Sequence, residues 1–197
     1  MADKATDKPW FWIIGGPNGA GKTTVASQFL KDFLPSAEFI NADEFAKQIA
    51  PGLPDSVAIM AGKQLLARRD RLFEIGSSFA IETTLASRSN LVAAKRAKLA
   101  GWKIGLVFVW LNSPELAIER VAERVRNLGH SIPKKTILRR YSRSMEQLEN
   151  YIEISDRWVI FDNSSDIPAR IAKSEDQQIE VFDQAIFNQI MVNHVNE

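Results

Sequence analysis

The sequence has 197 residues, 45% hydrophobic and 25% charged, which suits a globular protein with a buried core and argues against long disordered tails. Lys and Arg number 25 and Asp and Glu number 24, so the formal net charge of +1 argues against bulk nucleic-acid binding. There is no cysteine and there are only two histidines, which excludes disulfides, thiolate metal sites, a cysteine nucleophile and a three-histidine zinc site.

The N-terminal residues are polar and charged where a secretory signal would be apolar, and the most apolar run, 105–111, is too short to span a bilayer. We therefore expect a soluble, cytoplasmic protein that makes no membrane contact. No internal repeat or linker interrupts the chain, so residues 1–197 are expected to form a single domain.

The predicted elements begin with an apolar strand at 10–14, which runs into a glycine-rich loop and then into a helix from Thr24 to Pro35. Apolar runs that fit buried strands follow at 39–40, 79–81, 104–111 and 158–161. Segments with helical periodicity separate them, at about 43–50, 55–76, 87–100, 113–128 and 134–152, and strands at 169–173 and 179–182 precede a closing helix. This alternation predicts a three-layer α/β/α fold in which helices cover both faces of a parallel sheet.

The glycine-rich loop reads GPNGAGKT over residues 16–23 and satisfies the Walker A pattern GxxxxGK[ST] between a predicted strand and a predicted helix. Glycines let backbone amides converge on phosphate oxygens, and the helix N-terminus adds its positive dipole. We expect Lys22 to reach the β and γ phosphates of ATP and the Thr23 hydroxyl to ligate Mg²⁺. The expected nucleotide-binding residues are Gly16, Pro17, Asn18, Gly19, Ala20, Gly21, Lys22, Thr23 and Thr24.

Two acidic residues follow predicted strands, Asp43 after 39–40 and Glu82 after 79–81, at the sheet edge where ligands of open α/β folds collect. Asp43 could accept a proton from an acceptor hydroxyl, and it suits the N-cap of the next helix equally well. Glu82 could orient hydrated Mg²⁺ or bind substrate, or it could simply be solvated. Thr83 and Thr84 supply hydroxyls beside it.

A pair of arginines, Arg120 and Arg124, lies four residues apart on the predicted helix 113–128, with Arg126 nearby. Such a pair could clamp a transferring phosphoryl group, or it could form ion pairs with the glutamates that interleave with it. The helix breaks at 127–133 and a cationic helix follows, which predicts a lid over about 120–145 that excludes water from the nucleotide.

In this predicted lid, His130 is interpreted by default as a loop histidine without chemistry. The arginines of the second lid helix suit a solvated surface; these are Arg139, Arg140 and Arg143.

Taken together, these residues resemble the zeta-toxin family of P-loop kinases. The matching segments are, in order, GGPNGAGKTT, FINADEF, FAIETTLAS, FVWLNSPELAIERVAERV, GHSIP and RRYSRS, all within residues 10–163. The resemblance implies a P-loop NTPase fold of the nucleotide-kinase type with a five-stranded parallel sheet and a helical lid. It also implies transfer of the ATP γ-phosphoryl group to a hydroxyl of a nucleotide sugar, which is UDP-N-acetylglucosamine in the best-known members.

The resemblance assigns roles to residues at the matching positions. Lys22 and Thr23 match the nucleotide and Mg²⁺ positions, and Asp43 matches the general base. Glu82 and Thr84 match the substrate-side strand, with Glu82 also a candidate near Mg²⁺.

The same resemblance makes Arg120 the first phosphate-clamping arginine. The better-known toxins carry a second arginine just before the lid proline, where this chain has His130. The second clamp is therefore expected to fall to Arg124 or Arg126, and His130 is expected on the substrate side. The chain is also shorter than those toxins.

Two other functions stay open. One is a P-loop kinase that acts on another acceptor, such as a nucleoside, a sugar or a polynucleotide end. The other is a nucleotide-dependent binding switch without kinase activity. The kinase is favoured on the arrangement of the loop, the strand ends and the predicted lid, although Glu82 could substitute for the aspartate that switch and motor proteins use as a magnesium ligand. By family analogy the chain would act as a toxin and have an antitoxin partner that obstructs the ATP site.

Overall fold

The computed structural model describes residues 8–33, 37–51, 54–126 and 131–192, and its centre is one seven-stranded sheet in the order β2-β3-β1-β4-β5-β6-β7. Five neighbouring strands are parallel, which confirms the predicted parallel sheet, and the last two pair antiparallel at one edge. The parallel strands are β1 Trp10–Gly15, β2 Glu38–Ile40, β3 Phe79–Thr83, β4 Lys103–Trp110 and β5 Arg157–Asp162; the antiparallel ones are β6 Ala169–Glu175 and β7 Gln178–Val181.

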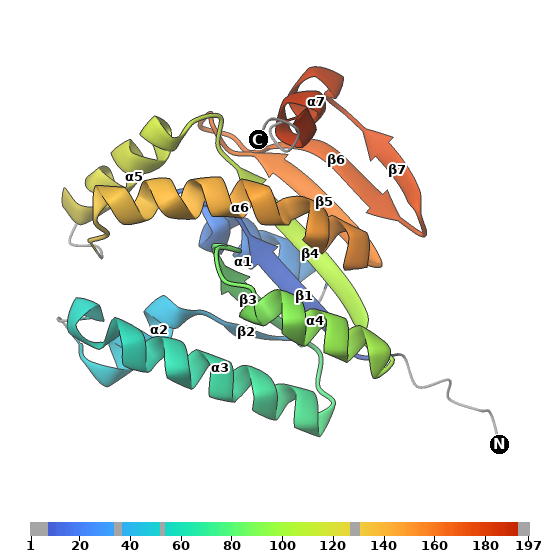
Figure 1. Cartoon of the computed structure of the whole chain (residues 1–197), viewed down its shortest axis with the longest axis horizontal. Coiled ribbons are helices and arrows are strands. Elements are labelled where there is room, and N and C mark those ends of the chain that lie inside the picture. The colour runs from blue at the N-terminus through green and yellow to red at the C-terminus, as the bar shows by residue number, and fades with distance from the viewer. Residues whose placement is uncertain (1–7, 34–36, 52–53, 127–130, 193–197) are drawn as a thin grey trace.

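Helices cover both faces of the sheet, as the alternation of elements predicts (Figure 1). Helices α3, α4, α6 and α7 contribute to the core on one face, and α1 and α5 contribute to the core on the other. Their bounds are α1 Lys22–Phe33, α2 Ala42–Ile49, α3 Ala58–Ile75, α4 Ser89–Leu99, α5 Pro114–Arg126, α6 Lys134–Ile154 and α7 Gln184–Val192, with a 3₁₀ turn at Pro54–Val57 before α3.

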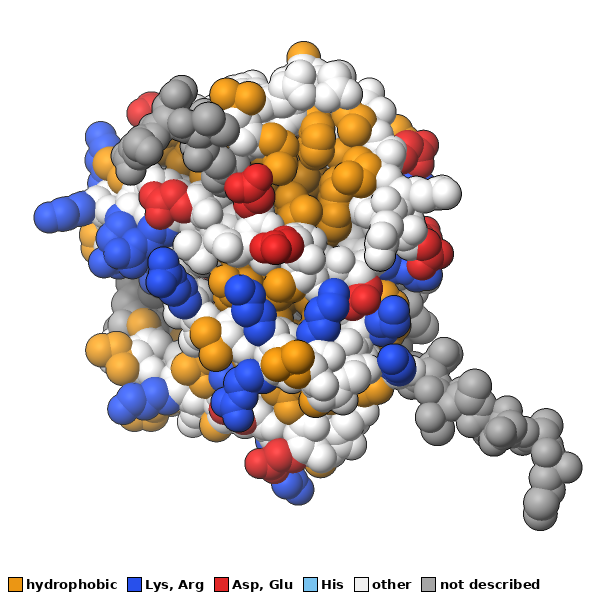
Figure 2. All heavy atoms as spheres, turned by 45° about the vertical axis from the view of Figure 1, so that its right-hand side comes forward, with side chains coloured by type: hydrophobic (Ala, Val, Ile, Leu, Met, Phe, Trp, Pro, Cys, Tyr) orange, Lys and Arg blue, Asp and Glu red, His pale blue; other side chains and the backbone are white. Residues whose placement is uncertain are grey.

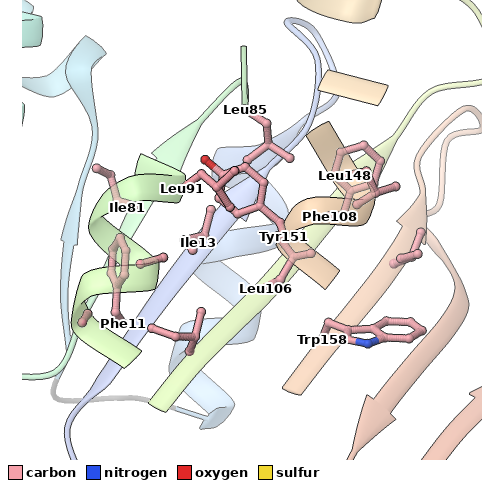
Figure 3. Packing of buried hydrophobic residues seen from close by; sticks show 14 of the residues in the cluster. Phe11, Ile13, Ile81, Leu85, Leu91, Leu106, Phe108, Leu148, Tyr151 and Trp158 are labelled. Atoms are coloured by element: carbon pink, nitrogen blue, oxygen red, sulfur yellow. The ribbon is translucent and has the colours of Figure 1, made fainter. Parts of the chain in front are cut away.

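The central strands are uninterrupted apolar runs in the sequence because their successive side chains point into the cores on opposite faces of the sheet. Along β1, Phe11 and Ile13 belong to the core under α4 and α6, whereas Trp12 and Ile14 belong to the core under α1 and α5. Figure 3 shows the first of these cores, in which the ring of Tyr151 from α6 lies among leucines of neighbouring elements. Both faces of the central strands are therefore buried. Their register is fixed because a shift would move the apolar side chains out of the two cores.

Parallel register brings the functional segments to one edge of the sheet. Gly15, the last residue of β1, is level with Thr83 of β3 and with Phe108 of β4, and Ile14 is level with Glu82. The glycine-rich loop that leaves β1 therefore lies next to the acidic end of β3. Since β2 pairs with the outer side of β3, its C-terminal continuation reaches the same edge.

Several predicted boundaries differ from the structure by a few residues. The first helix begins at Lys22 instead of Thr24, because the amides of Thr24 and Val25 already bond to the carbonyl of Gly21. The predicted helix 55–76 is divided into a 3₁₀ turn and α3, and Gly76 ends α3 in the left-handed conformation. At the start of α5, the Ser113 hydroxyl accepts a bond from the amide of Leu116 and caps the helix.

On the face drawn in Figure 2, Lys and Arg side chains lie among Asp and Glu side chains, beside a patch of hydrophobic ones. This mixture agrees with the near-neutral net charge. Within the part of the chain that the structure describes, no helix has the length and apolar character needed to cross a membrane.

Candidate functional site

A cleft of about 730 Å³ opens at the carboxyl edge of the sheet, between the glycine-rich loop, the end of β3 and helices α2, α3, α5 and α6. This volume is in the range of sites that hold drug-sized ligands. Five cations and two anions line it: Lys22, Lys63, Arg120, Arg124, Arg140, Asp43 and Glu82. The excess of positive charge suits a polyphosphate.

The glycine-rich loop is shaped by close contacts that leave no room for side chains. A Cβ on Gly16 would lie 2.2 Å from the carbonyl oxygen of Val109, and one on Gly21 would lie 2.5 Å from Nδ2 of Asn163. Both glycines also have positive φ, which other residues rarely adopt. The loop is thus pressed against the ends of β4 and β5, and it delivers Lys22 and Thr23 to the first turn of α1.

Lys22 is almost fully buried, at 6% exposure. Its ammonium group donates to the carbonyl of Pro17 at 2.8 Å and lies 3.9 Å from Oε1 of Glu82. Burial lowers the pKa of Lys22, and the charges of Glu82 and Asp43 oppose that effect. The lysine is therefore held on the loop beside the acidic end of β3.

Glu82 is the residue that joins the separate pieces of the site. Its Oε2 accepts bonds from the Thr23 hydroxyl at 2.7 Å and from Nδ2 of Asn41 at 2.9 Å, while Oε1 faces Lys22. The interpretation of Glu82 as a merely solvated strand end is wrong, because its side chain is only 16% exposed and contacts three residues from two other segments of the chain.

The oxygens of Thr23 and Glu82 fit a hard cation such as Mg²⁺. The hydroxyl and the carboxylate lie 2.7 Å apart, close enough for both to serve one ion or its bound water. Within the described residues no group of three or more His, Cys, Asp or Glu could hold a metal by itself. An Mg²⁺ ion held by these two oxygens would complete its shell with phosphate and water oxygens.

Asp43 lies in the first turn of α2 and does not cap it. The cap is Asn41, whose Oδ1 accepts a bond from the amide of Asp43 at 2.7 Å. The interpretation of Asp43 as the N-cap of α2 is therefore wrong. The Asp43 side chain is about half exposed, lines the cleft and lies 3.7 Å from the guanidinium of Arg124.

Of the arginines of the predicted lid, Arg120, Arg124 and Arg140 line the cleft, whereas Arg126 is exposed and does not. Arg120 donates to the backbone carbonyls of Asn163, Ser164 and Ser165, so its guanidinium holds the segment after β5. His130 lies outside the described residues.

The expectation that Arg140 is a solvated surface charge is wrong. Its guanidinium donates to Oδ1 of Asn18 in the glycine-rich loop at 3.3 Å. Its pKa is lowered, first by burial and then by the charge of Arg139, whereas Asp43 opposes the shift. Adjacent residues of a helix point in different directions, so Arg140 contacts the loop while its neighbour Arg139 is exposed. The sequence alone does not show which of the two arginines contacts the loop.

Two asparagines of the site are not among the site residues that the sequence predicts. Asn41 joins the cap of α2 to Glu82, and Asn163 donates from Nδ2 to the carbonyl of Ala20 at 2.8 Å. Both follow the carboxyl ends of parallel strands, as Asp43 does, and Glu82 lies at the carboxyl end of β3. The carboxyl ends of parallel strands point to Asp43 and Glu82 as site residues, and the same criterion applied to amide side chains points to these two asparagines.

The chain leaves β3 through a strained residue. Leu85 has φ of 58°, which is unfavourable for a branched side chain, yet the side chain is completely buried. It packs where a Cβ on Gly15 would lie, 2.9 Å away. The turn thus ties the segment after Glu82, including the cleft residue Thr84, to the base of the glycine-rich loop.

Comparison with known proteins relates this chain to one family. The family model described as zeta toxin matches residues 2–169. An uncharacterized protein of Haemophilus influenzae is 31% identical over 126 residues, which cover 64% of this chain and 88% of that protein.

Two solved structures are similar over nearly the whole chain. The AvrRxo1-ORF1:-ORF2 complex with ATP superposes with a TM-score of 0.76 at 14% identity, covering 97% of this chain and 66% of that one, so this chain spans less than two thirds of its length. A structure of the PezAT chromosomal toxin-antitoxin system of Streptococcus pneumoniae gives a TM-score of 0.68 at 20% identity, covering 100% and 84%. At these identities the likeness shows a common fold. Since the family model spans most of the sequence, the chain belongs to the zeta toxin family of P-loop kinases.

Proposed function

We propose that this chain is an ATP-dependent kinase that transfers the γ-phosphoryl group to a hydroxyl of a nucleotide sugar, such as UDP-N-acetylglucosamine, with Asp43 as general base. The observation that carries the proposal is the contact of Glu82 with Lys22, Thr23 and Asn41 in one cleft. Family membership and the similar fold of a complex that holds ATP support the nucleotide.

In this mechanism the chain contributes position and charge more than covalent chemistry. Lys22 would neutralise the β and γ phosphates, and Thr23 and Glu82 would hold Mg²⁺, which spreads the charge of those phosphates when bound. The acceptor hydroxyl gives its proton to the Asp43 carboxylate, and its oxygen bonds to the γ phosphorus. The bond from that phosphorus to the bridging oxygen breaks, and ADP leaves with the electron pair.

The cleft arginines serve the same transfer from the lid side. Arg124 lies close enough to Asp43 to keep the carboxylate near the phosphoryl group. Arg120, which donates to the carbonyl of Asn163 after β5, would be the first phosphate clamp. Arg140, which contacts the loop at Asn18, would be the second clamp in place of the expected Arg124 or Arg126. We also propose that Thr84 and His130 lie on the substrate side. The protein would act in the cytoplasm as a toxin, with an antitoxin partner that competes with ATP.

Product analysis by mass spectrometry tests the kinase. We expect the protein, given Mg-ATP and a mixture of UDP-sugars, nucleosides and simple sugars, to yield a phosphorylated UDP-sugar. Lys22→Ala should abolish this product, and Asp43→Asn should lower it by roughly 10²–10⁴ while ATP binding stays nearly intact. Glu44→Gln is the matched control, because Glu44 is exposed on the same turn and pairs only locally with Lys47.

Two results would contradict that proposal. ATP binding without any phosphorylated acceptor would favour the nucleotide-dependent switch. Loss of ATP binding in Asp43→Asn would show that Asp43 acts on structure and not on proton transfer.

The magnesium assignment predicts a specific defect in Glu82→Gln. Wild-type protein should bind ATP more tightly with Mg²⁺ than with EDTA, and the variant should lose about tenfold or more of that difference because the carboxylate charge is gone. Calorimetric titration measures both affinities, and thermal unfolding checks that the variant is folded. An unchanged ratio between the two affinities would remove Glu82 from the metal site.

The clamp assignment predicts that two adjacent arginines behave differently. Arg140→Ala should lower kcat by roughly 100-fold, since one charge on the transferring group is lost, whereas exposed Arg139→Ala should stay within about twofold. Steady-state kinetics at saturating ATP gives both values. Equal effects of the two substitutions would mean that Arg140 contributes only to the general charge of the lid.

A further inference from the structure

A second cavity, of about 190 Å³, lies on the face of the sheet that α1 and α5 cover, between β1, α1, β5 and β6. Of the residues that the structure describes, none lines both this cavity and the cleft of the proposed kinase. Its volume is smaller than that of sites for drug-sized ligands and suits a molecule with a single ring. The cavity is therefore a separate site, and its ligand has to be inferred from its own walls.

Aromatic rings form one wall of this cavity. The rings of Trp10 and Trp12 stack with their centroids 5.4 Å apart, and the ring of Phe29 from α1 lies 4.9 Å from that of Trp12. Gly105 on the neighbouring strand makes this possible, because a Cβ there would lie 2.3 Å from the Trp12 ring. Trp10 and Phe29 are only partly buried, so an apolar ring in the cavity would cover surface that they still expose.

The charged residues at the cavity leave one positive charge unmatched. Arg157 pairs with Glu175 at 2.8 Å, and Lys173 pairs with Glu180 at 2.9 Å. Arg170 also lines the cavity and is exposed, and within the described part of the chain it forms no ion pair. A ligand that complements this cavity therefore carries one negative charge.

The unmatched arginine lies beside the aromatic wall. Arg170 of β6 is directly opposite Phe161 of β5 in the antiparallel register, so the two side chains are on the same face of the sheet. Its guanidinium also lies 5.7 Å from the centroid of the Phe182 ring. A ring held in the cavity can thus carry its anionic group to Arg170 without leaving the aromatic residues.

We propose that this cavity is a second ligand site, which binds a small aromatic carboxylate. The ring packs against Trp10, Phe29 and Phe161, and the carboxylate accepts hydrogen bonds from the guanidinium of Arg170. A carboxylate suits this place because its planar pair of oxygens matches the guanidinium. The proposal goes beyond the kinase activity and does not depend on it.

Titrations with phenylacetate, phenylacetamide and acetate test this site through tryptophan fluorescence, because Trp10 and Trp12 line the cavity. Phenylacetate should bind about tenfold more tightly than phenylacetamide, which keeps the ring but lacks the charge, and also more tightly than acetate, which lacks the ring. Arg170→Gln should bring phenylacetate and phenylacetamide within about twofold of each other. Phe29→Leu should weaken both.

Arg96→Gln is the matched control, since Arg96 is exposed on α4 and lines neither cavity. It should leave all three affinities unchanged, and thermal unfolding checks that every variant is folded. Equal binding of phenylacetate and phenylacetamide by the wild type would overturn the proposal, and so would binding of acetate as tight as that of phenylacetate. A charge preference that survives in Arg170→Gln, or competition between phenylacetate and a non-hydrolysable ATP analogue, would also overturn it, because either result places the carboxylate elsewhere.

Discussion

The position of the Glu82 carboxylate is the constraint on which the geometry of the site depends. It comes from β3, yet it contacts a lysine and a threonine of the loop after β1 and an asparagine after β2. Parallel pairing with β3 in the middle of these three strands is what allows one side chain to reach all of them. Because Lys22 is buried, this nearby carboxylate also offsets part of the cost of burying its charge.

Two hydrophobic cores, one on each face of the sheet, hold this edge in position. The apolar strands are held level with one another, so the ends of β1 and β3 cannot slip without moving Gly15 away from Leu85. Leu85 keeps an unfavourable backbone conformation at that point. Strain of this kind persists where surrounding packing determines it, and here it joins the acidic segment to the phosphate loop.

Much of this arrangement was predictable because it depends on local patterns. Continuous apolar strands, helical periodicity and the loop motif predict the parallel sheet and the position of Lys22, and the strand-end rule selects Asp43 and Glu82. The cap of α2 was harder, since Asn41 and Asp43 both suit it and only the backbone geometry separates them. Arg140 was not predictable, because its contact with Asn18 joins residues 122 positions apart and its neighbours on α6 are equally basic.

In the proposed mechanism, one edge of the sheet holds the phosphates, the metal ligands and the base in line. A crystal structure with Mg²⁺ and a non-hydrolysable ATP analogue would show this arrangement. We expect Lys22 on the β and γ phosphates, Mg²⁺ on the Thr23 hydroxyl beside Glu82, and the γ phosphate facing Asp43 with room for one acceptor oxygen between them. A γ phosphate that points away from Asp43, or a metal ion distant from Glu82, would contradict it.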